Sequence, residues 1–295
     1  MTSLIVLGSL NRDLTVVVER HPLPGETVLG GSVVTGTGGK GANQAAAAAR
    51  EGATPVFVGA VGSDAVGDEL LADLARAGVD VSHVTRSPGP SGMALITVDR
   101  SGENSIVVAS GANATLDAGV IAALIERLAT KDTVLLAQLE IPLGVVEEAA
   151  DRLEKVGGRL VLNLSPATTV SPRLLGFADP LVVNESEASD LAGSAIDGPA
   201  DAETIAGRLL AGSRSVVLTL GGDGVVVADA AGVTHLPAKP VTVVDTTGAG
   251  DAFAGALAAA LAAGEDLGAA VQKGIDAGAE AVQYLGAQPP NGPTV

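Results

Sequence analysis

The chain has 295 residues, and 47% of them are hydrophobic while only 1% are aromatic, so one large domain can be built around Ala, Val, Leu and Ile side chains. Thirty-four acidic residues against seventeen basic ones give a formal net charge of −17, which argues against nucleic-acid binding because such a chain repels a phosphate backbone. The absence of cysteine excludes disulfides and thiolate chemistry, and three histidines are too few for a multi-histidine metal site.

No segment of the sequence is typical of membrane insertion or export. The start, "MTSLIVLGSL", has no basic region before its short apolar run, and the Ala-rich stretch "AFAGALAAALAAG" is too short to span a bilayer. We therefore expect a cytoplasmic protein without membrane contact.

The first predicted strand is residues 4–8, and a β-rich stretch without helical periodicity follows it. Helix signals begin at Gly41, and a second β-only patch reads as a hairpin turning at Ser101-Gly102. From residue 117 onward helices and strands alternate. Further strands are predicted at 55–62, 133–139, 159–164, 180–184, 215–220 and 241–245, with a short antiparallel meander at 224–238 and two Ala-rich helices at the end.

This alternation predicts an α/β fold, a three-layer αβα arrangement in which helices flank a mostly parallel sheet, as a single domain over residues 1–295. The two β-only patches, about 10–36 and 90–110, do not fit those layers. They either pair into one small sheet that forms a lid or remain two ordinary edge hairpins, and periodicity alone leaves both open.

The loop "GTGGKGANQ" (36–44) contains G-x-G-x-x-G, but neither nucleotide-binding interpretation of it fits. A Rossmann fingerprint directly follows the first strand, and a P-loop needs Ser or Thr where Gly41 stands. Glycines before a helix still let backbone amides approach a polar ligand, with Lys40 and Asn43 adding donors. The loop is thus a candidate site for a polar small molecule, and the alternative is a plain glycine-rich turn.

A second glycine-rich turn lies in "VTVVDTTGAGDAFAG" (241–255). Asp251 falls at a predicted helix start, just after the amides of Gly248, Ala249 and Gly250. Such amides stabilise charge on a transferring phosphoryl group, and the carboxylate can accept the proton of an attacking hydroxyl. The alternative is that Asp251 is an ordinary N-cap.

Other polar residues follow predicted strands. Asn184 and Glu187 of "NESE" fit a capping box, which the sequence favours, or a Mg²⁺ site that uses water and phosphate. "TLGGDG" (219–224) suits either a nucleotide or a tight hairpin. Asn11, Asp13 and Glu140 lie at or beyond strand ends, where α/β proteins bind ligands.

Taken together and in order, "GSLNRD", "PLPGETV", "GGKGANQA", "QLE", "NESE", "TLGGDG", "DTTGAGDAF" and "GAQP" resemble the ribokinase-like, PfkB-type family of sugar kinases over essentially the whole chain. The resemblance implies ATP-dependent phosphorylation of the primary hydroxyl of D-ribose, with Asp251 as catalytic base and Gly248, Ala249 and Gly250 as the anion hole. It implies that the sugar contacts are Asn11, Asp13, Gly39, Lys40, Asn43, Glu140 and Asp251.

The resemblance also implies the other ligands of this active site. ATP would border Thr219, Gly221, Gly222, Gly224 and Gly250, and Asn184 with Glu187 would serve Mg²⁺, Glu187 through water. Activation by K⁺ would use Asp245, Thr247, Ala281, Tyr284 and Gly286, although Pro290 stands where relatives often place a serine. A homodimer through the lid sheet is expected as well.

Three alternatives accompany this interpretation. A related kinase would act on deoxyribose, another sugar or a nucleoside, although adenosine favours aromatic stacking that this chain can barely supply. An NAD-dependent oxidoreductase depends on the G-x-G-x-x-G string alone. A sugar-binding protein without catalysis would have no use for "GAGD".

Overall fold

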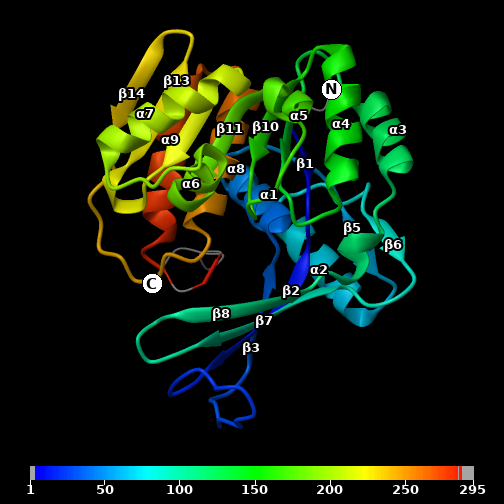
Figure 1. The fold of residues 1–295 in the computed structure, drawn as a ribbon. Helices are drawn as coiled ribbons and strands as arrows, with labels where there is room; N and C mark the ends of the chain where they lie inside the picture. The colour runs from blue at the N-terminus through cyan, green and yellow to red at the C-terminus, as the bar shows by residue number, and fades with distance from the viewer. Residues whose placement is uncertain (1–3, 285, 288–295) are drawn as a thin grey trace.

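The computed structural model describes residues 4–284, 286 and 287. At its centre lies an eight-stranded sheet (Figure 1). Its strands are β1 (Leu4–Leu7), β4 (Val56–Val58), β9 (Val134–Ala137), β10 (Arg159–Asn163), β11 (Ala178–Asn184), β12 (Val216–Thr219), β13 (Val225–Asp229) and β14 (Gly232–Leu236). The spatial order is β14-β13-β12-β11-β10-β9-β1-β4, parallel from β12 to β4, with β13 and β14 antiparallel at the edge.

The inner strands are largely apolar runs because both faces of the sheet are covered. In β1 all four residues are buried, and successive side chains point to opposite faces. Ile5 and Leu7 join one hydrophobic core, whereas Leu4 and Val6 join the other. One layer of helices therefore packs on each face.

The core of Ile5 and Leu7 is closed by α3 (Ala118–Leu128), α4 (Leu143–Val156), α5 (Pro172–Phe177), α6 (Glu185–Ala192) and α7 (Pro199–Leu209). The opposite core is closed by α1 (Lys40–Arg50), α2 (Ala65–Arg76), α8 (Ala249–Ala262) and α9 (Leu267–Ala281). Short 3₁₀ turns are η1 (Gly111–Thr115), η2 (Leu210–Gly212) and η3 (Gly221–Asp223). The predicted three-layer αβα arrangement is confirmed.

The two β-only patches form one small sheet that projects from the main body (Figure 1). Its strands are β2 (Asn11–Val17), β3 (Val34–Gly38), β7 (Gly92–Val98) and β8 (Asn104–Ala109), in the order β3-β2-β7-β8. The alternative of two separate hairpins is wrong, because β2 pairs in parallel with β7. A two-stranded sheet of β5 (Ala60–Gly62) and β6 (Thr85–Ser87) completes the fold.

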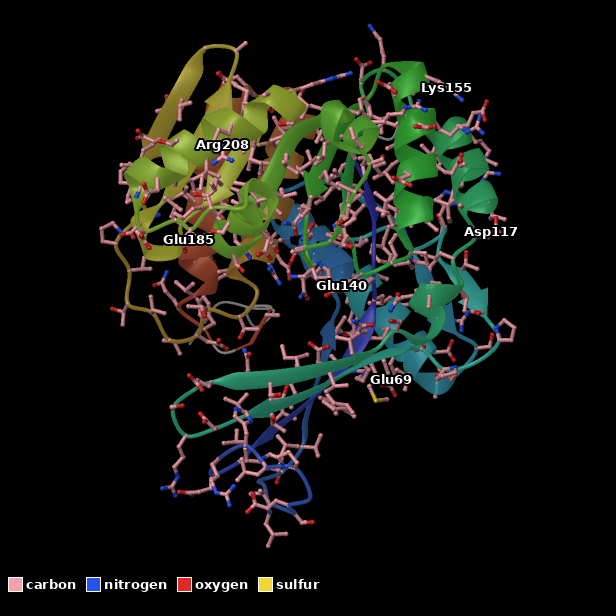
Figure 2. All side chains as sticks on the ribbon, in the orientation of Figure 1. Glu69, Asp117, Glu140, Lys155, Glu185 and Arg208 are labelled. Carbon is pink, nitrogen blue, oxygen red and sulfur yellow. The ribbon has the colours of Figure 1, made fainter. Side chains whose placement is uncertain are left out.

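Two polar contacts attach the small sheet to α2. Arg12 of β2 donates to Glu69 over 2.7 Å, and Thr37 Oγ1 of β3 donates to Asp73 over 2.6 Å. Glu69 lies beside the small sheet in Figure 2. The Arg12–Glu69 bond involves a largely exposed glutamate, and such surface bonds contribute little stability. These contacts therefore orient the small sheet more than they stabilise it.

Two predicted strands differ from the structure. Residues 55–62 are divided at Gly59 into β4 and β5, which pair in different sheets. Residues 241–245 are not a strand, because the amides of Val244 and Asp245 donate to the carbonyl of Val282 instead of to a neighbouring strand. The side chains of Val243 and Val244 are more than half exposed, so no sheet face buries them.

Candidate active site

The glycine-rich loop joins the small sheet to α1. Gly39, between β3 and α1, has φ of 89°, and a Cβ there would lie 2.9 Å from the carbonyl oxygen of Ser9, so both backbone conformation and space call for glycine. The backbone N–H of Lys40 and Ser9 Oγ both donate to Glu140 Oε2, at 3.1 and 2.5 Å. The loop thereby connects the ends of β1 and β9, and Figure 2 shows Glu140 where the main body meets the small sheet.

Asp251 lies in the first turn of α8, but it is not the N-cap. That position belongs to Gly248, with φ of 78°, so the capping interpretation of Asp251 is wrong. The side chain is 9% exposed and accepts two amide hydrogen bonds from α1. Asn43 Nδ2 donates to Oδ2 over 3.0 Å, and Gln44 Nε2 donates to Oδ1 over 2.9 Å.

Burial raises the pKa of Asp251. The positive charge of Lys40 and the hydrogen bonds from Gln44 and Asn43 oppose this rise, whereas the charge of Glu140 adds to it. A buried carboxylate with a raised pKa and a nearby cation is typical of a general base.

Asn11 and Asp13 stand at the start of β2, where the small sheet leaves the main body. Asn11 is buried, and its Oδ1 accepts a hydrogen bond from Asn113 Nδ2 over 2.8 Å. Asp13 Oδ1 is buried without a hydrogen-bond partner. Burial raises the pKa of Asp13 from its ordinary 3.8 to about 6; the charges of Glu140 and Asp251 add to the rise, and Arg12 opposes it. Asp13 Oδ1 is thus an unpaired buried acceptor, and the carboxylates of Glu140 and Asp251 influence the same group. Such an arrangement is suited to a ligand that donates hydroxyl hydrogens.

Of the residues expected at the nucleotide, Asn184 and Thr219 end β11 and β12 and are neighbours in register, whereas Gly250 lies in the first turn of α8. Asn184 and Glu187 form a reciprocal capping box on α6, with two 2.9 Å hydrogen bonds, as the sequence favours. Gly221, Gly222 and Gly224 form the turn between the antiparallel β12 and β13. The hairpin is thus observed, and nucleotide binding there stays a prediction.

Residues expected at a monovalent cation lie close together as well. The two carboxylate oxygens of Asp245 accept the backbone N–H groups of Thr247 and Gly286, at 2.9 and 2.8 Å. Burial opposes ionisation of Asp245, but these amides hold its pKa below the ordinary value. The amide of Tyr284 donates to the carbonyl of Ala281, and Pro290 lies outside the described residues.

Several site-lining polar residues escaped sequence reasoning. Gln44 and Gln138 are fully buried, and Asn113 is 1% exposed. Three of the missed residues could have been found from the sequence: Gln44 is a polar residue beside the alanine run of α1, and Gln138 and Asn163 are polar residues near the ends of the apolar stretches 133–139 and 159–164. The missed residues are Ser9, Gln44, Asn113, Gln138 and Asn163.

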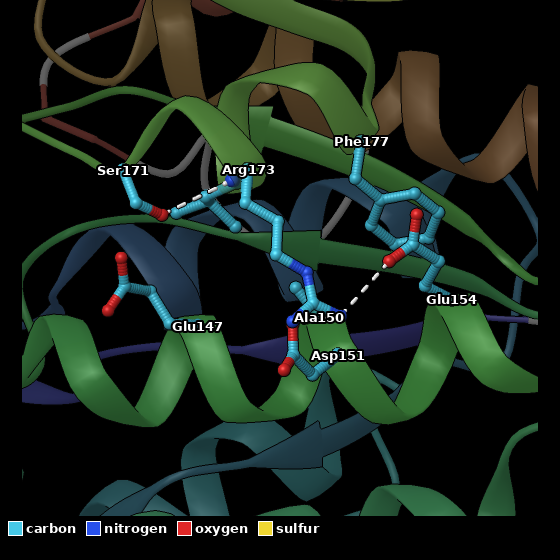
Figure 3. Close-up of a pocket in the computed structure, with 8 residues that line it drawn as sticks. Glu147, Ala150, Asp151, Glu154, Ser171, Arg173 and Phe177 are labelled. Carbon is cyan, nitrogen blue, oxygen red and sulfur yellow. Dashed lines mark hydrogen bonds and ion pairs between the residues drawn. The ribbon is translucent and has the colours of Figure 1, made fainter.

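A separate small pocket lies between α4 and α5 (Figure 3) and shares no residue with the cluster around Asp251. Its cation, Arg173, is already paired with Asp151 at 3.0 Å and Glu154 at 3.4 Å. Because these two carboxylates neutralise the charge of Arg173, the pocket is not suited to a phosphate group.

Residues 1–294 match the family model of the pfkB family carbohydrate kinases. The chain is 40% identical to the ribokinase of Haemophilus influenzae and 39% identical to that of Schizosaccharomyces pombe, in each case over 97% of this chain and 94% of the relative. The structure of Arabidopsis thaliana ribokinase complexed with ribose and ATP superposes with a TM-score of 0.85 at 30% identity, covering 96% of this chain and 93% of that one.

The chain belongs to the pfkB family of carbohydrate kinases. It is accordingly an enzyme that transfers a phosphoryl group to an alcohol acceptor. Among the residues that the structure describes, none of the helices has the length and apolar character needed to cross a bilayer.

Proposed function

We propose that the chain transfers the γ-phosphoryl group of ATP to the primary hydroxyl of D-ribose, giving ribose 5-phosphate and ADP. The observation that carries this proposal is the buried Asp251 carboxylate, held by two amides in the first turn of α8. The similarity to curated ribokinases over nearly the full chain supports ribose as the acceptor.

In this mechanism Asp251 takes the proton of the primary hydroxyl as the oxygen attacks the γ-phosphorus in line, and the bond to the ADP oxygen breaks. The backbone N–H groups of Gly248, Ala249 and Gly250, at the positive end of α8, stabilise the developing negative charge. These roles fit the first turn of a helix, whose amides have no intrahelical acceptors, although the amide of Ala249 donates to the carbonyl of Thr246 over 3.2 Å.

The sugar would lie between the Gly39–Asn43 loop and the start of the small sheet. Its secondary hydroxyls would donate to Asp13 and Glu140 and contact Asn11 and Lys40. The unpaired Asp13 Oδ1 supports this placement, because hydroxyl hydrogens would satisfy it. The small sheet would act as a lid of a single domain, closing over the sugar to exclude water that competes as acceptor.

ATP would border Thr219, the 221–224 turn and Gly250. Mg²⁺, when bound, would neutralise charge on the transferring phosphates, with Glu187 and Asn184 holding its water ligands. A single carboxylate with phosphates and waters is an ordinary Mg²⁺ donor set, so the residues present fit the ion.

K⁺ would bind beside Asp245 and Thr247, using backbone carbonyls of Ala281, Tyr284 and Gly286. Oxygen donors around an ionised carboxylate fit a hard monovalent cation. The hydrogen bonds of Asp245 to both segments support a role in shaping the turn before the anion hole.

A homodimer through the small sheet is also proposed. That sheet exposes apolar side chains that are 46–63% exposed in the single chain, with the register partners Leu95 and Val107 on one face and Ile106 and Val108 on the other. Exposed apolar strands favour burial against a second copy.

The test is ADP release by purified protein with ATP, Mg²⁺ and K⁺ across a panel of D-ribose, 2-deoxy-D-ribose, D-fructose and adenosine. We expect release only with an acceptor present and the highest kcat/KM with D-ribose. A higher value with a hexose or a nucleoside would reject ribose as the substrate, and no turnover with any acceptor would reject the kinase.

A further inference from the structure

A chain of amide side chains, two of them fully buried and one partly buried, leads from the ends of two central strands to Asp251. Gln138 directly follows β9, Asn163 ends β10, and Gln44 lies on the first turns of α1. Gln138 Nε2 donates to Gln44 Oε1 over 2.6 Å, and Gln44 Nε2 donates to Asn163 Oδ1 and to Asp251 Oδ1, both over 2.9 Å. The side chains of Gln44 and Gln138 are 0% exposed.

The carboxylate of Asp251 and the amide oxygen of Asn163 set the orientation of the Gln44 amide, because both accept from Nε2. If it were flipped, Oε1 would face the oxygens of Asp251 and Asn163, and Nε2 would face the donor of Gln138. Asn163 is oriented in turn, because its Nδ2 donates to the carbonyl of Val182. The chain thus points an N–H group at Oδ1 of Asp251.

Close packing of α1 on α8 brings this donor within reach. Gly255, one helical turn after Asp251, lies on the same face of α8. A Cβ at Gly255 would be 2.4 Å from the carbonyl oxygen of Gln44 and 2.7 Å from Ala47 Cβ. Only glycine lets the backbones of α1 and α8 approach so closely. The hydrogen bond between Gln44 and Asp251 therefore depends on this close packing of the two helices.

The charged groups that affect Asp251 come from three elements. Lys40 of α1 favours its ionised form, Glu140 after β9 disfavours it, and Asp13 of β2 interacts with it as a like charge. Gln44 is neutral, so it adds a directed hydrogen bond without adding to the competition among these charges.

We propose that Gln44 is a positioning residue for catalysis, oriented by Gln138 and Asn163, which fixes the Asp251 carboxylate toward the acceptor site. Asn43 holds the other carboxylate oxygen, so the two amides of α1 together set the rotation of the base. This inference deepens the proposed function and rests on Asp251 acting as base, but the hydrogen bond itself is testable without turnover.

The test is a carboxyl ¹³C NMR titration of Asp251 in the ligand-free protein, with Asp251→Asn used to assign the resonance. Gln44→Met removes the donor at nearly the same length. Because a hydrogen bond to a carboxylate stabilises its charged form, we expect the midpoint to rise by about one pH unit. Gln138→Met leaves Gln44 Oε1 without the donor that holds it, so the Gln44 amide is fixed less firmly and the midpoint should rise in the same direction by less.

Kinetics provide a second readout. In Gln44→Met the acidic limb of kcat should move up in pH with the titration, kcat should fall by about tenfold or more, and KM for the sugar should change little. Ser215→Ala is the control for lost stability, since this buried hydroxyl donates to Asp179 elsewhere in the fold. It should leave the titration and the pH profile unchanged.

An unchanged midpoint in Gln44→Met would overturn the inference. If that variant does not fold, an unchanged midpoint in Gln138→Met would do the same. Absence of turnover in the parent protein would reject the proposed function, and the carboxyl titration would still decide whether Gln44 holds Asp251.

Discussion

Asn43 and Asp251 are 208 residues apart in the sequence, yet Nδ2 of Asn43 donates to Oδ2 of Asp251 over 3.0 Å. The contact joins the first turns of α1 and α8, the helices that follow the two glycine-rich loops. The loop proposed to hold the acceptor and the loop proposed to stabilise the phosphoryl group therefore meet at one carboxylate.

Asp251→Asn tests the role of that carboxylate. An amide has the same size but cannot take the hydroxyl proton, so kcat should fall by roughly 10²- to 10⁴-fold. The dissociation constant for ribose, measured by calorimetry, should stay within about threefold. Asp190→Asn, an exposed position on α6, is the matched control with unchanged activity. A kcat near the parent value in Asp251→Asn would show that another group is the base.

Asp13→Asn tests a trade between stability and binding. Its pKa is about 6 in the fold and 3.8 ordinarily, so between these values the folded state binds more protons, and the free energy of unfolding falls as pH rises through this window. At pH 7.5 the substitution should raise the free energy of unfolding by at most about 3 kcal/mol, and the melting temperature should rise with it. Near pH 4 it should have little effect.

The same substitution should weaken ribose binding at neutral pH, because a carboxylate accepts more hydroxyl hydrogens than an amide does. In the parent protein, ribose affinity should fall as pH drops below 6, by up to about tenfold per pH unit. Affinity that is independent of pH from 5 to 8 would indicate that Asp13 does not contact the sugar. Asp190→Asn again serves as the control.

Fold and site differ in how far the sequence predicted them. The parallel sheet followed from apolar runs such as 133–136, and both glycine-rich loops were recognised as functional candidates. The strand predicted at 241–245 failed because β-propensity did not reveal that the end of α9, at Val282, takes its amides. Gln44 was missed because its role depends on tertiary contacts with Gln138 and Asn163, which no local pattern encodes.

Asp245→Ala tests the proposed cation site. In the parent, replacing K⁺ by Na⁺ at constant ionic strength should lower kcat several-fold, since the larger ion suits carbonyl donors set by the 245–247 and 281–286 segments. Without the carboxylate that accepts the amides of Thr247 and Gly286, the two ions should give equal, reduced rates. The same preference for K⁺ in the variant would place the cation elsewhere.

Val107→Glu tests the proposed dimer. Val107 is 63% exposed on β8 and pairs in register with Leu95 of β7. A charge there cannot be buried against a second copy without a large desolvation cost. Light scattering after size exclusion should show a dimer for the parent and a 28.8 kDa monomer for the variant. Val233→Glu, on the β14 edge and 41% exposed, should remain dimeric. A dimeric Val107→Glu would argue against this interface.

The most direct test of the central claim is the position at which phosphate enters D-ribose. Protein, ATP, Mg²⁺, K⁺ and D-ribose are incubated, and the product is observed by proton-coupled ³¹P NMR. Transfer to the primary hydroxyl predicts a new resonance split by the two protons on C5, appearing together with ADP and forming far more slowly with Asp251→Asn. A resonance coupled to a single ring proton, or inorganic phosphate alone, would contradict the account.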